Sequence, residues 1–344
     1  FLKTYHPYTQ ALLSAIPIIR KPMGTGPWVF SEWIAGDSVS LIRNDNYWGE
    51  KPYFGKLVIR TITDDTTRAL ALETGEVDYV IEVVSSQIDY INQGEMATVE
   101  LIPGRTLEYV AMNEAFEPLK DVRVRQALMY AIDLPSMVNL AYGVSGIPAD
   151  GIFFPGNVFY TPAASTYAQN IEKAQALMAE AGYADGFTCR LICKDVSTRV
   201  TMCEMLANAW SNLNVKVEIG VMDIATYYNF ILSGDYEMGL GGFVCQVNDG
   251  DMYHDMFYSE CGYSSNYAQY KNDEFDELAE LGRYELDNNL RKECYDKIQE
   301  ILRNDLPWLP ICFATETYGC RNTLSGAYLY DNGIPTFDKV VPAA

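Results

Sequence analysis

The chain has 344 residues, of which 49% are apolar and 21% are charged, which is the composition of a globular protein with more than one compact domain. It carries 25 Lys and Arg against 46 Asp and Glu, so the net charge is −21. This balance argues against a nucleic-acid partner, because such binding needs a basic footprint. The acidic residues are scattered along the chain. They are interpreted as a solubilising surface, with attraction of a cationic ligand as the alternative.

No apolar run reaches the roughly 18 residues that a membrane-spanning helix needs. The first residues, starting at Phe1, lack an initiator Met and the basic and apolar regions of a secretory signal. The chain is therefore expected to be a processed product or a fragment.

The eight cysteines form no CxxC pair, and the only histidines are His6 and His254, so neither a zinc site nor any other cofactor is predicted. Cys189 and Cys193 are four residues apart in a predicted strand. Their Cα atoms would lie about 13 Å apart, too far for a direct disulfide. The cysteines are at positions 189, 193, 203, 245, 261, 294, 312 and 320.

The first part of the chain predicts short strands at 28–30, 38–42 and 56–60. A helix follows, capped by Asp64 or Asp65, and a strand is predicted at 77–81. This strand–helix–strand order predicts a right-handed crossover unit. Gly49 and Gly75 are interpreted as positions that need a positive φ.

The second part alternates strands and helices, which indicates an α/β fold. Strands are predicted at 107–113, 188–193, 215–219, 238–244 and 308–315, and helices at 122–141, 171–181, 200–213 and 224–232. Residues 273–304 form a long amphipathic stretch that predicts one or two helices.

Four segments carry a resemblance to one family. The first segment has G-T-G-P-W at 24–28, R-N at 43–44 and Y-W-G at 47–49. The second is the predicted helix at 64–78, which begins with the pattern D-x-x-T-R, and the third runs from Asn113 to Ile132-Asp133. The fourth is S-N-Y at 265–267, followed by a helical stretch that ends near Pro307 and Pro310. In order and spacing they resemble the peptide- and nickel-binding solute-binding proteins of ABC importers. Within these motifs Arg68, Arg123 and Arg125 are interpreted as structural.

The resemblance implies a two-lobed clamshell of the type II periplasmic-binding-protein class, with the N-terminal subdomain absent from this chain. Residues 1–106 with 316–344 would form an incomplete first lobe, and 107–315 the larger lobe. Crossing strands near 107–113 and 308–320 would join them. An incomplete lobe would expose an edge or an apolar face, so the start of the chain is expected to pack anomalously or to pair with a second copy.

Ligand-binding residues are expected on the crossing strands. Tyr109 lies where relatives carry a ligand-facing aromatic residue, although a half-buried strand tyrosine is an equal alternative. Arg105 is interpreted either as a partner for a carboxylate or as a solvated arginine. Phe313 lies on the second crossing strand, and Arg199 is a candidate partner for a peptide C-terminus.

The segment from Gly242 to Asp251 resembles the family's W-x-A-D-Y-x-D-P-D motif. Phe243 replaces the tryptophan, Cys245 precedes the first acidic position, and Gln246 occupies the position of the aspartate that pairs with a peptide α-ammonium. A neutral amide cannot supply that charge. Either the solute lacks a free amine, or another acid such as Asp249 serves.

The sequence therefore predicts an extracytoplasmic solute-binding component, periplasmic or lipid-anchored, that delivers an oligopeptide or peptide-like solute to a membrane permease and ATPase. An oligosaccharide or other non-peptide solute, and a ligand sensor on the same fold, are the alternatives. No HExxH or G-x-S-x-G motif supports an enzyme. Nickel is disfavoured because only two histidines are present.

Overall fold

The computed structural model describes residue 22 and residues 24–163 and 167–343. The expectation about the start of the chain falls on residues outside this range. The described residues divide into two compact units, one up to Gly104 and again from Glu316, the other from Arg105 to Thr315. We call them unit 1 and unit 2 and describe each by itself.

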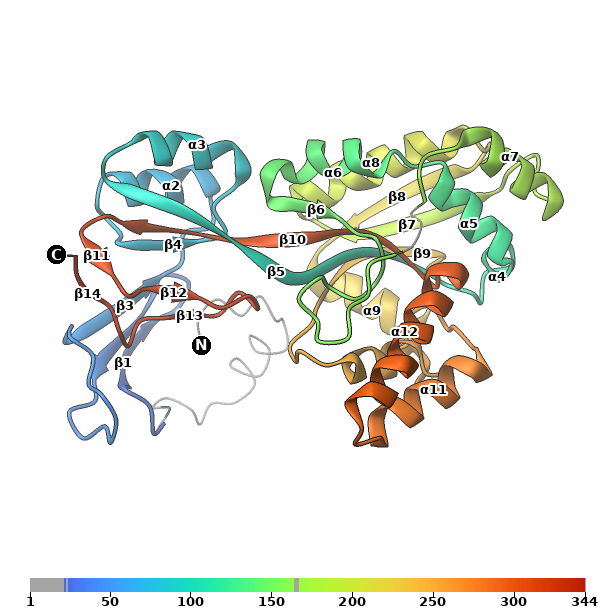
Figure 1. The fold of residues 1–344 in the computed structure, drawn as a ribbon. Coiled ribbons are helices and arrows are strands. Elements are labelled where there is room, and N and C mark those ends of the chain that lie inside the picture. Colours follow the sequence, from blue (N-terminus) through green and yellow to red (C-terminus); the bar gives the residue numbers. More distant parts are fainter. Residues whose placement is uncertain (1–21, 23, 164–166, 344) are drawn as a thin grey trace. The chain divides into compact units, whose positions relative to one another are not determined.

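Unit 1 combines a small antiparallel sheet with a helical layer (Figure 1). The sheet has the order β1-β2-β3, and α2 and α3 pack their apolar sides on β4 and on the first part of β5. The elements are β1 Trp28–Ile34, β2 Ser38–Arg43, β3 Lys56–Arg60, α2 Asp65–Glu73, β4 Tyr79–Ile81, α3 Ser85–Gln93, the start of β5 Ala97–Met112, the end of β10 Trp308–Arg321, β11 Leu324–Ser325, β12 Tyr328–Leu329, β13 Pro335–Thr336 and β14 Val341–Pro342.

Two predictions for unit 1 were wrong. The strands β3 and β4 flank α2, which Asp64 caps as expected, but they belong to different sheets and so do not form a crossover unit. Gly75 has the expected positive φ of 75°, whereas Gly49 does not. A Cβ atom on Gly49 would lie 2.8 Å from the ring of Tyr47, so close packing accounts for that glycine.

Unit 2 contains a sheet in the order β10-β5-β9-β7-β8, with helices on both faces (Figure 1). Its elements are the rest of β5, α4 Glu117–Lys120, α5 Val122–Tyr130, α6 Leu134–Tyr142, β6 Gly146–Pro148, α7 Ile171–Glu180, β7 Thr188–Lys194, α8 Ser197–Ser211, β8 Lys216–Met222, α9 Ile224–Ser233, β9 Met238–Val244, α10 His254–Phe257, α11 Asp273–Tyr284, α12 Asn288–Asp305 and β10, with short 3₁₀ helices at Gly143–Ser145, Gly250–Tyr253 and Gly262–Ser264.

The strands of unit 2 alternate between two apolar cores. In β5, Val110 and Met112 face the core that α5, α6, α7 and α8 cover, whereas Leu107 and Tyr109 face the core that α9, α11 and α12 help to close. This period of two is what a sheet covered on both faces requires. The α/β fold class predicted from the alternation of elements is therefore confirmed.

Four helices of unit 2 begin at a side-chain cap. Asn170, Asp223, Asn272 and Asp287 each accept a backbone N–H at the start of α7, α9, α11 and α12, which satisfies a donor that has no partner within the helix. The prediction of one helix at 122–141 was wrong. Asp133 accepts the N–H of Ser136 and starts α6 as a separate helix.

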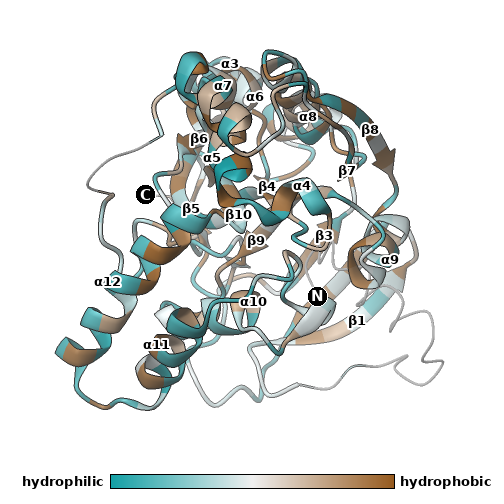
Figure 2. Cartoon of the chain, turned by 90° about the vertical axis from the view of Figure 1, so that its right-hand side faces the viewer, coloured by the Kyte–Doolittle hydropathy of each residue, from teal (hydrophilic) through white to brown (hydrophobic). Residues whose placement is uncertain are grey.

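Amphipathic patterning explains the pair of helices near the end of unit 2. Brown and teal segments alternate along α11 and α12 in Figure 2, and the buried residues of α12 recur every three or four positions. The long stretch at 273–304 therefore forms two helices, and Asp287 caps the second.

A buried ion pair ties α8 to the sheet. Arg199, in the first turn of α8, donates from Nε and Nη2 to the two carboxylate oxygens of Glu108 in β5, at 2.9 and 2.8 Å. Their side chains are only 14% and 5% exposed. A Cβ atom on Gly242 of β9 would lie 2.5 Å from Arg199 Nη2. The guanidinium of Arg199 can therefore occupy this position only because residue 242 has no side chain.

Two other motif arginines are also structural, as predicted. Arg68 donates to the carbonyl oxygens of Ile62 and Glu82. Arg125, which is 3% exposed, donates to the carbonyls of Leu119 and Asp305. Both side chains therefore satisfy backbone oxygens in buried or partly buried positions.

We predict that Gly242→Ala lowers the free energy of unfolding by about 1–3 kcal/mol, because the new methyl group displaces the ion pair. Gly151→Ala is the matched control, since its nearest neighbour, Arg303 Nη1, would lie at an ordinary 3.6 Å. Urea unfolding measures both. Equal losses in the two variants would contradict this role of Gly242.

We predict that Glu108→Gln costs about 3–5 kcal/mol, because it leaves the guanidinium of Arg199 buried without its counter-charge. The double variant Glu108→Gln/Arg199→Met should lose clearly less than the sum of the single variants. Denaturant unfolding of all three variants gives the coupling. Additive losses would show that the two side chains do not act as a pair.

Candidate solute-binding edge of unit 2

All eight residues singled out in the sequence lie in unit 2. Its strands β7, β8 and β9 are parallel to one another, and β5 is antiparallel to β9. The ends of β7, β8 and β9 therefore lie at the same end of the sheet as the start of β5 in this unit. We call this end the carboxyl edge and define it by Arg105, Lys194, Met222 and Val244. In α/β sheets, ligands bind outside the carboxyl ends of the strands.

The carboxyl edge brings some of the expected residues together. The N–H of Cys245 donates to the carbonyl of Arg105 at 3.0 Å, and Phe243 pairs with Leu107. Cys245 is 1% exposed, and burial raises the pKa of its thiol. The guanidinium of Arg105 lies 5.4 Å above the ring of Phe154 and is half-buried.

The expected aromatic residues lie in the core beneath this edge. The ring of Tyr109 stacks on Trp308 with 3.7 Å between centroids, and burial raises the pKa of its phenol well above the usual value. Phe243 meets the same Trp308 edge-on at 5.8 Å and stays half-buried. Phe313 is 2% exposed. Tyr109 and Phe313 are thus packed in the core in this structure, and Phe243 is the more accessible of the three.

Arg199 is paired with Glu108, so its positive charge is already neutralised within the unit. Burial opposes the charged form of the Arg199 guanidinium, but the adjacent carboxylate of Glu108 outweighs this and raises its pKa. A solute carboxylate would have to compete with a bidentate pair that is largely desolvated. The geometry therefore gives Arg199 a role in positioning α8.

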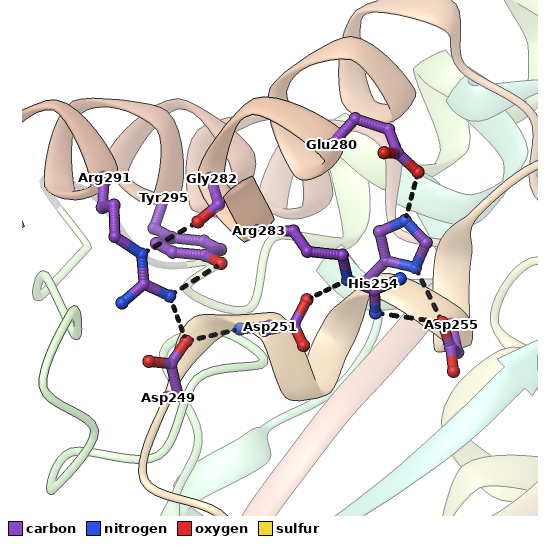
Figure 3. A network of polar contacts seen from close by, with 9 residues as sticks. All are labelled: Asp249, Asp251, His254, Asp255, Glu280, Gly282, Arg283, Arg291 and Tyr295. Carbon is purple, nitrogen blue, oxygen red and sulfur yellow. Dashed lines mark hydrogen bonds and ion pairs between the residues drawn. The ribbon is translucent and has the colours of Figure 1, made fainter. Parts of the chain in front are cut away.

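The segment after β9 presents a neutral group and a paired acid. Gln246 is exposed. Asp249 accepts the N–H of Asp251 and pairs with Arg291 of α12 at 2.6 Å (Figure 3). Arg291 also donates to the carbonyl of Gly282 at 2.8 Å. Asp249 is therefore a structural acid that holds its segment to α12.

The polar network continues along α10 and α11 (Figure 3). Arg283 pairs with Asp251 at 2.6 Å and with Asp255 at 3.3 Å. His254 is 5% exposed and places Nδ1 2.7 Å from Asp255 and Nε2 3.2 Å from Glu280. A hydrogen bond from His254 lowers the pKa of Asp255. Within the described residues, no cluster of His, Cys, Asp or Glu is arranged to hold a metal ion.

Lys194 is a candidate that sequence reasoning missed. It ends β7 at the carboxyl edge, and its ammonium donates to the hydroxyl of Tyr228 at 3.2 Å. The same ammonium lies 4.6 and 5.3 Å from the ring centroids of Tyr228 and Tyr227. No ion pair joins it to a carboxylate in the part of the chain that the structure describes. The signal in the sequence was a lysine closing an apolar strand, but its tyrosine partners are 33 and 34 residues away.

A separate cavity of about 400 Å³ lies within unit 1 and contains none of the eight expected residues. Its walls are mostly apolar and include Leu57, Ile59, Tyr79, Ile81 and Phe337. Burial is the main cause that raises the pKa of Tyr79.

Self-association through this unit stays a prediction. Among the described helices, none is both long enough and apolar enough to cross a membrane.

Comparison with known proteins identifies relatives that bind solutes. The chain is 27% identical over 305 residues to heme-binding protein A of Haemophilus influenzae, covering 85% of this chain and 54% of that protein. It is 27% identical over 327 residues to the dipeptide-binding protein of Escherichia coli K12, covering 93% and 61%. The chain thus spans little more than half the length of these relatives.

Solved structures confirm the fold expected from the resemblance, that of the type II periplasmic binding proteins. A dipeptide-binding protein of Pseudoalteromonas in complex with Met-Leu matches with a TM-score of 0.84 and 26% identity, over 98% of this chain and 69% of that one. The periplasmic binding protein DppA of Helicobacter pylori in complex with the peptide STSA matches with a TM-score of 0.84 and 25% identity, over 99% and 67%.

A family model described as bacterial extracellular solute-binding proteins, family 5 middle region, matches residues 10–265, which is more than half of the chain. This chain belongs to the bacterial extracellular solute-binding proteins of family 5.

Proposed function

We propose that this chain is the solute-binding part of an ABC importer, that it works outside the cytoplasm, and that its solute is an oligopeptide or a peptide-like molecule. The family match carries this proposal, and relatives named for dipeptides and glutathione support the peptide-like class. A permease and an ATPase would be its partners. Attachment to the outer face of the membrane by a lipid belongs to the same proposal.

The carboxyl edge of unit 2 would contact an acidic group of the solute through Lys194. A cation that packs on two tyrosine rings and has no carboxylate partner keeps its charge available for an incoming anion. Arg199 does not offer this, because Glu108 already neutralises it. The phenol of Tyr228, 3.2 Å from the ammonium, would hold Lys194 in place and offers a second polar contact.

The amino end of a peptide would find no unpaired carboxylate in the segment after β9. Gln246 is neutral and Asp249 is paired with Arg291, so an α-ammonium would stay uncompensated there. This arrangement favours a solute whose amino end is blocked or absent. Free and N-acetylated peptides of the same sequence separate the two cases.

We predict that the full-length protein binds at least one peptide in a panel of di- to pentapeptides with free or blocked ends. A solute at 100 times its dissociation constant should raise the free energy of unfolding by about 2.7 kcal/mol, which a thermal shift assay detects. The panel includes oligosaccharides and haem. A shift with one of these and with no peptide would replace the peptide assignment. Ligand-dependent contact with a signalling protein, and none with a permease, would favour a sensor.

We predict that Lys194→Met weakens binding of a C-terminally free peptide by about 10- to 100-fold, because a hydrogen bond to a charged group is lost. The variant should also lose any preference for the free acid over the C-terminal amide. Lys216→Met, at the exposed start of β8, is the matched control and should bind like the parent. Calorimetric titration measures all three proteins. Unchanged affinity of the Lys194 variant would refute this contact.

A further inference from the structure

A buried carboxyl group lies where the end of β5 meets α5 and the end of α12. Glu114 follows β5, and its N–H donates to the carbonyl of Ala268 at 2.8 Å. The side chain of Glu114 is 17% exposed. Its Oε1 atom is buried, and none of the described residues donates a hydrogen bond to it. An ionised carboxylate oxygen in such a place loses its hydration without gaining a donor.

The nearest cation does not supply the missing donor. Arg125 Nη1 lies 3.4 Å from Glu114 Oε1. However, Nη1 already donates to the carbonyls of Leu119 at 2.7 Å and Lys120 at 3.1 Å, and Nε donates to the carbonyl of Asp305 at 2.6 Å. Both N–H groups of Nη1 are therefore used on backbone oxygens. The guanidinium thus lies close to Glu114 but is held by the joint between α5 and α12.

A second carboxylate belongs to the same cluster. Asp305, at the end of α12, accepts hydrogen bonds from the hydroxyl of Tyr270 and from the side-chain amide of Asn272. Burial and the hydrogen bond to Asp305 raise the pKa of Tyr270, so the phenol keeps its proton for this bond. Burial raises the pKa of Glu114 to about 7, with the charge of Arg125 opposing this rise and that of Asp305 adding to it.

We propose that Glu114 is a proton-sensitive switch at this joint: the protonated carboxyl leaves the joint tight, and the ionised carboxylate weakens the contact of the β5 end with α5 and α12. The neutral group can stay dry, whereas the carboxylate must gain water or a donor, which requires the joint to open. The groups that face Glu114 are those of Arg125, Asp305 and Tyr270. Other charges on the adjoining segments are the pairs Glu117–Lys120 and Asp121–Arg123 and the exposed Lys271.

The switch makes the folded state more stable in acid than in base. In the unfolded chain the pKa of this carboxyl returns to 4.5. The stability that the protonated contact contributes is therefore fully present below about pH 4.5 and is lost as the pH rises through about 7. A protein that works outside the cytoplasm meets such changes of pH. The regulatory meaning of the switch therefore rests on the proposed function, whereas its effect on stability does not.

Urea unfolding of the full-length protein at pH 5 and pH 8 tests the switch. Glu114→Gln places a neutral group of the same shape at this position. We expect the ratio of the unfolding constants, parent over variant, to rise about tenfold or more from pH 5 to pH 8, because each unit of pKa difference corresponds to a factor of ten. Glu117→Gln, on an exposed residue three positions later, is the matched control, and its ratio should stay constant. A ratio for Glu114→Gln that does not change with pH would overturn the proposal.

NMR of the wild-type protein, labelled with ¹³C at the glutamate carboxyl carbons, decides the matter even if Glu114→Gln fails to fold. One carboxyl signal should titrate near pH 7. Asp305→Asn should move this titration to lower pH, because a nearby negative charge is removed. The absence of a glutamate signal that titrates near neutral pH and responds to Asp305→Asn would contradict the switch. Solute binding is measured separately, so a failure of the switch leaves the proposed function standing.

Discussion

The buried pair between Glu108 and Arg199 is the interaction on which the carboxyl edge depends. It joins the middle of β5 to the first turn of α8, and both side chains are largely removed from water. Removing either partner alone would leave a charge buried without compensation, which is far more costly than losing an exposed pair. Gly242 supplies the space that the pair occupies. The pair fixes the first turn of α8 on β5, and α8 begins three residues after Lys194, the last residue of β7.

Lys194 differs from the acidic residues of the segment after β9, which form ion pairs within unit 2. Asp249, Asp251 and Asp255 are all engaged by arginine or histidine side chains of their own unit. These acids hold the segment after β9 to α11 and α12 and offer little to a ligand. Lys194 places a cation on two tyrosine rings at the carboxyl edge, which is why the proposed solute carries an acidic group.

The sequence predicted what depends on short-range patterns. Alternation and turn signals placed β9 at 238–244, and caps such as Asp64 marked helix starts, because these signals act within a few residues. Long-range pairing was out of reach. Arg199 and its partner Glu108 are 91 residues apart, so nothing local distinguishes a committed arginine from a free one. The inward packing of the Tyr109 ring depends in the same way on Trp308, which stacks on it but lies far away in the sequence.

A crystal structure of the full-length protein with its solute bound tests the central claim most directly, through the distance from Lys194 Nζ to the nearest solute oxygen. We predict a carboxylate oxygen within hydrogen-bonding distance of this ammonium, with the pair between Arg199 and Glu108 intact. A solute carboxylate bound to Arg199, with Glu108 displaced and Lys194 turned away, would contradict the account.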